Sequence, residues 1–185
     1  MEYYSKAIDR EPNKGYLYYN LANIYFRQGN YSKCIDNYNK NIELNPNNYK
    51  PYINLGLTYF KQGDYTRSIE NLEKGVLLDP KSAKSYFNLG RAYEKKGDLI
   101  DAISAYENAI VLDKNYSKPY RNLGNIRSEQ GKSELAKELY QKAYELGDTS
   151  LKRYLEYDKI SDESKDFVKT GWDYFENKDY DNAYL

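Results

Sequence analysis

The feature that most constrains this chain is an internal repeat with a period of 34 residues. Strings of related sequence begin at Tyr18, Tyr52, Tyr86 and Tyr120, so each start lies 34 residues after the one before. A strict period of this length is typical of stacked units, each of which buries its apolar face against its neighbours. The chain is therefore expected to fold as a linear array.

Each repeat has the pattern of two amphipathic helices joined by a tight turn. In the second copy, Tyr52, Leu55 and Tyr59 recur at the three- and four-residue spacing of one helix face. Gly63 interrupts this pattern, as a glycine just past a helix end does, and Pro80 stops the second helix because proline cannot continue one. Alternation with a period of two is absent, so an all-α fold is expected.

These residues resemble the tetratricopeptide repeat family. Numbered from Gly15, Tyr49, Ala83 and Ser117, every copy has an aromatic at position 4 and leucine at position 7. Small residues stand at position 8 (Ala22, Gly56, Gly90, Gly124) and at position 20 (Cys34, Ser68, Ala102, Ala136). The copies depart from the pattern at Arg127 (position 11), Asn41 (position 27), and Lys114 and Asp148 (position 32). The resemblance implies a right-handed superhelical solenoid of antiparallel helix pairs.

The period also divides the chain. We expect complete repeats at residues 15–48, 49–82, 83–116 and 117–148, and the second helix of a truncated upstream repeat at residues 1–14. Residues 149–163 are expected to form an extra helix or spacer, and residues 164–185 a truncated further repeat. A chain that starts and stops inside repeats is expected to be a fragment of a longer protein.

Composition argues against several classes of function. Histidine is absent and Cys34 is the single cysteine, which removes the usual general base and the common zinc ligands, so we expect no enzyme activity, metal or cofactor. The 28 basic and 28 acidic residues balance, which disfavours nucleic acid as a partner. No apolar run is long enough to span a membrane, and the N-terminus is not a secretory signal, so a cytoplasmic location is expected.

The resemblance implies that the first helix of each repeat lines a concave groove, through positions 2, 5, 6, 9, 12 and 13. Position 6 is asparagine in every complete copy. Amides both donate and accept, so a row of them can pair with a peptide backbone; codon bias with repeat duplication is the competing explanation. The expected groove residues are Asn20, Asn23, Lys50, Asn54, Lys84, Asn88, Arg91, Lys118, Arg121, Asn122 and Asn125, with Tyr19, Phe26 and Phe60 as aromatic contacts.

The expected groove is basic, with eight positive and two negative side chains at these positions. Such a surface favours an acidic peptide or a free C-terminal carboxylate. Chaperone-adaptor members of the family hold a carboxylate in a clamp. Three of the five clamp positions match here, at Asn23, Asn54 and Lys84. The remaining two do not, because Tyr19 replaces a lysine and Asn88 replaces an arginine.

The leading hypothesis from the sequence is a protein-interaction scaffold that binds an extended, acidic peptide. A similar asparagine ladder occurs in the O-linked N-acetylglucosamine transferases, so one alternative is the substrate-recruiting arm of a larger enzyme such as a glycosyltransferase. Self-association through the repeats is a third hypothesis.

Overall fold

The structure is a computed structural model that describes residues 2–157. Its helices are α1 (Glu2–Arg10), α2 (Gly15–Arg27), α3 (Tyr31–Leu44), α4 (Tyr49–Lys61), α5 (Tyr65–Leu78), α6 (Ala83–Lys96), α7 (Leu99–Leu112), α8 (Ser117–Glu129), α9 (Ser133–Glu145) and α10 (Lys152–Tyr157), with a 3₁₀ turn at Thr149–Leu151. The end of the expected spacer and the expected further repeat at residues 164–185 lie outside the described residues.

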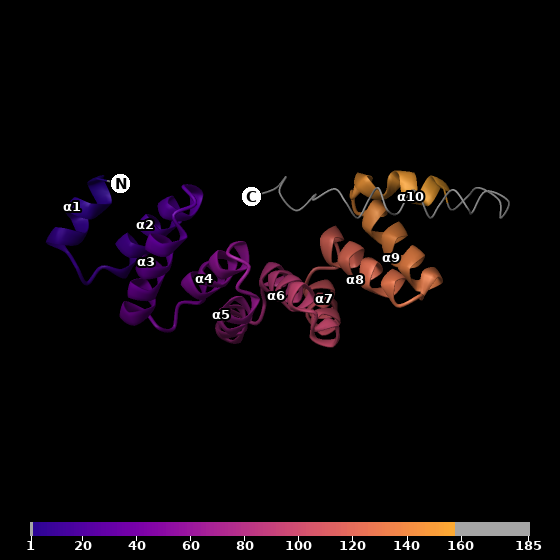
Figure 1. Cartoon of the computed structure of the whole chain (residues 1–185), viewed down its shortest axis with the longest axis horizontal. Coiled ribbons are helices and arrows are strands. Elements are labelled where there is room, and N and C mark those ends of the chain that lie inside the picture. The colour runs from indigo at the N-terminus through magenta and orange to yellow at the C-terminus, as the bar shows by residue number, and fades with distance from the viewer. Residues whose placement is uncertain (1, 158–185) are drawn as a thin grey trace.

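The helices pack in consecutive pairs that follow one another along an arc (Figure 1). The tightest contacts lie within the pairs α2–α3, α4–α5, α6–α7 and α8–α9. In the middle of the arc, α4 and α6 lie toward the inner side of the curve, whereas α5 and α7 lie toward the outer side. The predicted all-α solenoid of helix pairs is confirmed, and no strand occurs within residues 2–157.

A small residue on the first helix lets a large one on the second helix approach it closely. A Cβ atom added to Gly90 would lie 2.7 Å from the ring of Tyr106, and one added to Gly124 would lie 2.6 Å from that of Tyr140. Both tyrosines are almost completely buried. In the second pair, Leu72 occupies the equivalent position. The glycines at position 8 are therefore required by packing.

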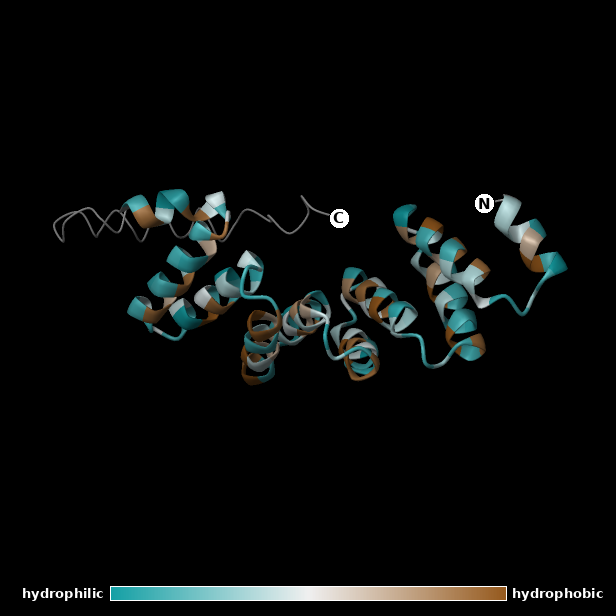
Figure 2. Cartoon of the chain, turned by 180° about the vertical axis from the view of Figure 1, so that it is seen from behind, coloured by the Kyte–Doolittle hydropathy of each residue, from teal (hydrophilic) through white to brown (hydrophobic). Residues whose placement is uncertain are grey.

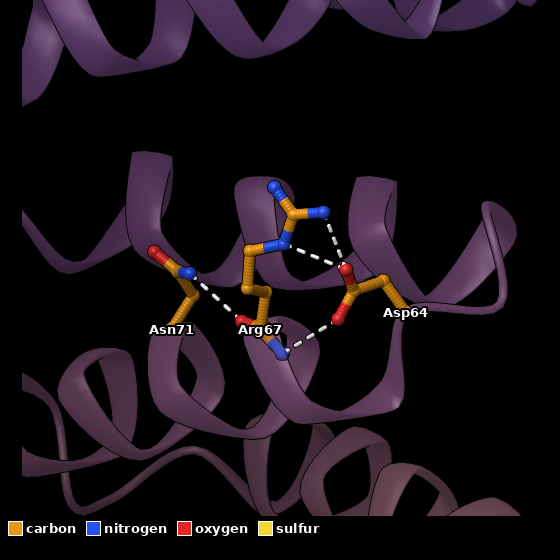
Figure 3. A network of polar contacts seen from close by, with 3 residues as sticks. All are labelled: Asp64, Arg67 and Asn71. Atoms are coloured by element: carbon orange, nitrogen blue, oxygen red, sulfur yellow. Dashed lines mark hydrogen bonds and ion pairs between the residues drawn. The ribbon is translucent and has the colours of Figure 1, made fainter.

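The turn inside each pair is set by local chemistry. Gly63 has φ of +78°, a left-handed conformation that L-residues with side chains rarely adopt. Asp64 then caps α5 by accepting a hydrogen bond from the backbone N–H of Arg67 at 3.0 Å, and it forms an ion pair with the same guanidinium (Figure 3). The Asn71 amide donates to the carbonyl of Arg67 one turn later. These contacts fix where the second helix starts.

Apolar residues concentrate on the faces where helices meet, and polar residues cover much of the outside (Figure 2). The departure at Asn41 has a structural reason, because its amide is buried and donates to the backbone carbonyl of Gly15 at 2.6 Å. This bond ties α3 to the start of α2. Among the described helices, none combines the length and apolar character that a membrane crossing requires.

Candidate functional site

The structure places all the predicted groove residues on the first helices of the pairs: α2, α4, α6 and α8. Lys50 and Lys84 are exposed and Asn88 is buried. The others are partly buried: Asn20, Asn23, Asn54, Arg91, Lys118, Arg121, Asn122, Asn125, Tyr19, Phe26 and Phe60. Their contacts differ from one junction to the next. We call the contact between consecutive helix pairs a seam and number the seams from α2–α3/α4–α5 onward.

The first seam contains a hydrogen-bonded network built from two of the predicted asparagines. The Tyr38 hydroxyl donates to Asn23 Oδ1 at 2.6 Å. Asn54 Nδ2 donates to the same oxygen and to the Tyr19 hydroxyl, both at 3.1 Å. Burial raises the pKa of Tyr38. Asn23 and Asn54, two of the residues that match the carboxylate clamp, are therefore bonded to each other and to the fold.

The third seam contains a similar network around a carboxylate. The Tyr106 hydroxyl donates to Glu94, and Asn122 Nδ2 donates to the Tyr106 hydroxyl at 3.0 Å and to Glu94 at 3.4 Å. Burial and the adjacent negative charge of Glu94 raise the pKa of Tyr106 well above its usual range. The predicted groove amide Asn122 is therefore also engaged within the fold. In the last pair, Tyr140 donates to Asn125 Oδ1 at 2.9 Å.

The second seam has no such network around its position-6 asparagine; its described polar contact is at an exposed site, where the Tyr93 hydroxyl on α6 donates to Glu73 on α5. The repeat positions that supply partners at the other seams hold apolar side chains in the second repeat, namely Ile53, Leu57, Phe60 and Leu72. Asn88 is only 6% exposed, and its side chain forms no hydrogen bond to any residue in the described part of the chain. Of the position-6 asparagines, Asn20 also lacks a described partner, but it is less buried.

Arg91 lies beside this seam, held between aromatic rings. Its guanidinium carbon is 4.7 Å from the ring centroid of Phe60 on α4 and 5.8 Å from that of Phe87 on its own helix. The Phe87 ring also packs edge-on against Tyr116, with centroids 5.1 Å apart. Burial raises the pKa of Tyr116 to about 12, while the positive charge of Arg91 acts in the opposite direction. A cation on aromatic faces is well oriented for a planar anion.

Charge is distributed unevenly between the two sets of helices. The first helices α2, α4, α6 and α8 carry ten basic and two acidic side chains. The second helices α3, α5, α7 and α9 carry six basic and nine acidic side chains. Within the described residues, Lys50, Lys61, Lys84 and Lys95 form no ion pair. The neutral chain therefore has one strongly basic set of helices.

Two acidic residues reduce that charge in ways that the sequence did not reveal. Asp148 forms an ion pair with Arg121 at 3.0 Å, and Asp148 is largely buried. Glu94 looks like a surface residue in the sequence, but it accepts hydrogen bonds from Tyr106 and Asn122. These partners are distant along the chain, so no local spacing could have identified them.

Models of the tetratricopeptide repeat match the chain at residues 3–36, 22–63, 56–97 and 83–148, and so extend from residue 3 to residue 148. The chain belongs to the tetratricopeptide repeat family. No curated protein matches it.

Several solved structures of tetratricopeptide repeat proteins are similar to this chain. The crystal structure of the MamA protein is 28% identical, with a TM-score of 0.74, and the match covers 92% of this chain and 97% of that chain. YrrB, a repeat protein with an unusual peptide-binding site, is 22% identical, with a TM-score of 0.73 and coverage of 86% and 81%; it supports the fold alone. The first repeat domain of Spaghetti, bound to the HSP90 peptide SRMEEVD, is 25% identical, with a TM-score of 0.62 and coverage of 64% and 94%.

Proposed function

We propose that this tetratricopeptide repeat chain is a scaffold that binds an extended, acidic peptide segment of another protein along its first helices. The observation that carries the proposal is the charge asymmetry between the two helix sets. Ten basic side chains stand against two acidic ones on the first helices, whereas acidic residues exceed basic ones on the second helices. Such a surface attracts an acidic ligand and disfavours a basic one.

Aromatic side chains on the same helices supply the apolar part of the surface. Tyr19, Phe26 and Phe60 are partly buried and retain contact with solvent. Large aromatic groups of this kind commonly contribute most of the energy at a peptide interface. The similar Spaghetti domain supports the proposal because its bound peptide ends in an acidic sequence.

The proposal is tested with Lys50→Glu combined with Lys84→Glu, measured by fluorescence anisotropy against labelled acidic peptides. Both lysines are exposed, so the fold should be preserved. Affinity should fall by about tenfold or more, which corresponds to a loss of at least about 1.4 kcal/mol in binding free energy. Wild-type affinity should also fall as salt rises, because mobile ions screen exposed charges.

The matched control is Lys33→Glu combined with Lys74→Glu, which makes the same charge change on exposed positions of α3 and α5. This control should retain most of the affinity. Equal losses in both double variants would show that net charge matters and the location of the lysines does not, and the proposed groove would then be wrong.

A further inference from the structure

At the second seam, the largely buried amide of Asn88 has no hydrogen-bond partner among the described residues. Such an amide depends on water or a ligand for its hydrogen bonds, because leaving them unmade in a buried position costs about 1–3 kcal/mol. Asn88 is in this state, whereas Asn54 and Asn122 at the same repeat position are bonded within the protein. The difference comes from Leu57 and Leu72, which stand where other repeats place a hydrogen-bonding side chain.

The Asn88 amide is still reached by solvent. Among the described residues, the side-chain nitrogen and oxygen atoms that are fully buried and have no hydrogen-bond partner are Asn41 Oδ1, Ser68 Oγ and Arg127 Nε. Neither polar atom of the Asn88 side chain belongs to this group. Its remaining exposure therefore includes its polar end. A ligand atom can therefore approach part of this amide, although the residue is only 6% exposed.

Arg91 lies three residues after Asn88, one turn further along the same helix. Its guanidinium is stacked on Phe60 and Phe87. The aromatic rings restrict its side chain, so less conformational entropy is lost when it binds an anion. The neighbouring Glu94 accepts hydrogen bonds from Tyr106 and Asn122, and an acidic ligand would have to compete with this carboxylate for the charge of Arg91. Exposed Lys84 begins the same helix and adds positive charge.

We infer that the second seam determines which peptides the groove binds. It recognises an extended peptide in which an internal acidic residue is followed or preceded by a large apolar residue. Asn88 pairs with the peptide backbone, Arg91 binds the acidic side chain, and the partly buried ring of Phe60 packs against the apolar one. This inference rests on the proposed function and deepens it. It also places recognition away from Asn23 and Asn54, whose hydrogen bonds are already used within the first seam.

The experiment uses the full chain and fluorescein-labelled eight-residue peptides that are blocked at the C-terminus, with one Glu next to one Leu in a Gly-Ser background. Asn88→Leu should weaken binding by about fivefold to tenfold, as expected for a lost hydrogen bond of about 1 kcal/mol. Arg91→Gln should weaken it by about tenfold or more, and only for peptides that contain Glu rather than Gln, because the lost hydrogen bonds are to a charge.

A second variant tests Asn88 without removing it. Leu57→Asn combined with Leu72→Tyr gives the second seam the side chains that form the first-seam network. Gly56 offers the same close approach that accommodates tyrosine beside Gly90 and Gly124. The Asn88 amide should then bond within the protein, and affinity should fall to about the level of Asn88→Leu while thermal stability is maintained.

The matched control is Asn108→Leu, an exposed asparagine on α7, which should leave binding unchanged. If acidic peptides bind in a salt-dependent manner that requires Lys50 and Lys84, but Asn88→Leu and Arg91→Gln bind as well as wild type, the inference is overturned and the proposed function stands. If no acidic peptide binds the wild-type protein, the proposed function fails, and this inference fails with it.

Discussion

The first and third seams contain partly buried polar networks, whereas the interior of the second seam is apolar and its polar contact, Tyr93 with Glu73, lies at an exposed site. Tyr38 and Tyr106 each donate a hydrogen bond within their own repeat, and the amides of Asn54 and Asn122 connect these networks to the next repeat. Leu72 takes the place of those tyrosines in the second repeat and packs in a cluster with Ile53, Ile69 and Val76. Repeats of one family can therefore be joined by two kinds of interaction.

This contrast shows that a repeated residue need not have a repeated role. Asn54, Asn88 and Asn122 stand 34 residues apart, yet two of them stabilise seams and one retains its hydrogen-bonding capacity. The role of each asparagine depends on the polar side chains that the preceding repeat places beside it, which are Tyr19 and Asn23 for Asn54, and Glu94 and Tyr106 for Asn122. The following predictions test the contrast, in order of expected effect.

Leu72→Ala should have the largest effect, because the second seam relies on buried apolar contact. Leu72 is 0% exposed, so its truncation should lower the free energy of unfolding by about 2–5 kcal/mol. Urea denaturation followed by circular dichroism would measure this loss. The matched control, Leu77→Ala on the same helix, removes a side chain that is 72% exposed and should change stability by less than about 0.5 kcal/mol. Equal effects would contradict the apolar description of this seam.

Tyr106→Phe should cost about 1.5–3 kcal/mol, since it removes a hydrogen bond to the charged Glu94 inside the third seam. Tyr93→Phe is the control, because the Tyr93 hydroxyl donates to Glu73 at an exposed site. Its loss should be smaller. A comparison of the two urea midpoints tests whether burial of the network, rather than the bond itself, provides the stability.

Asn54→Leu and Asn88→Leu should differ although they make the same change at equivalent positions. Asn54→Leu removes two hydrogen bonds from the first seam and should cost about 1–2 kcal/mol. Asn88→Leu removes an amide without a described partner and should leave stability unchanged or raise it. Thermal melting of both variants would measure this difference in stability. A comparable loss in Asn88→Leu would mean that this amide supports the fold, against the further inference.

Alkaline pH should weaken the polar seams gradually. The pKa of Tyr106 is raised in the folded protein, so the folded state holds the phenolic proton more tightly than the unfolded state does. Stability present below a pH of about 10, the ordinary tyrosine pKa, is therefore lost as pH rises, by at most about 1.4 kcal/mol per pH unit for this group. Tyr106→Phe should make the decline shallower in urea titrations between about pH 8 and 11. Exposed Tyr16→Phe should not alter the slope.

The period and the apolar spacing were sufficient to predict the all-α solenoid of helix pairs. They also placed the predicted groove residues on first helices, because a helix position follows directly from the repeat register. Which of those residues are available to a ligand could not be predicted. The bonds of Asn54 to Tyr19 and Asn23 join residues more than thirty positions apart, and the ion pair of Arg121 with Asp148 crosses a helix pair.

The sequence by itself determined the family, the helices and the uneven charge of the two helix sets, since these depend on local spacing and composition. Only the tertiary structure decided which polar side chains are used within the seams. A buried hydroxyl or amide must find a partner wherever packing brings one near, and Leu72 brings none to Asn88. The asparagine repeated in the sequence is thus hydrogen-bonded within the fold at two seams and has no described partner at the other, where we propose that it binds a ligand.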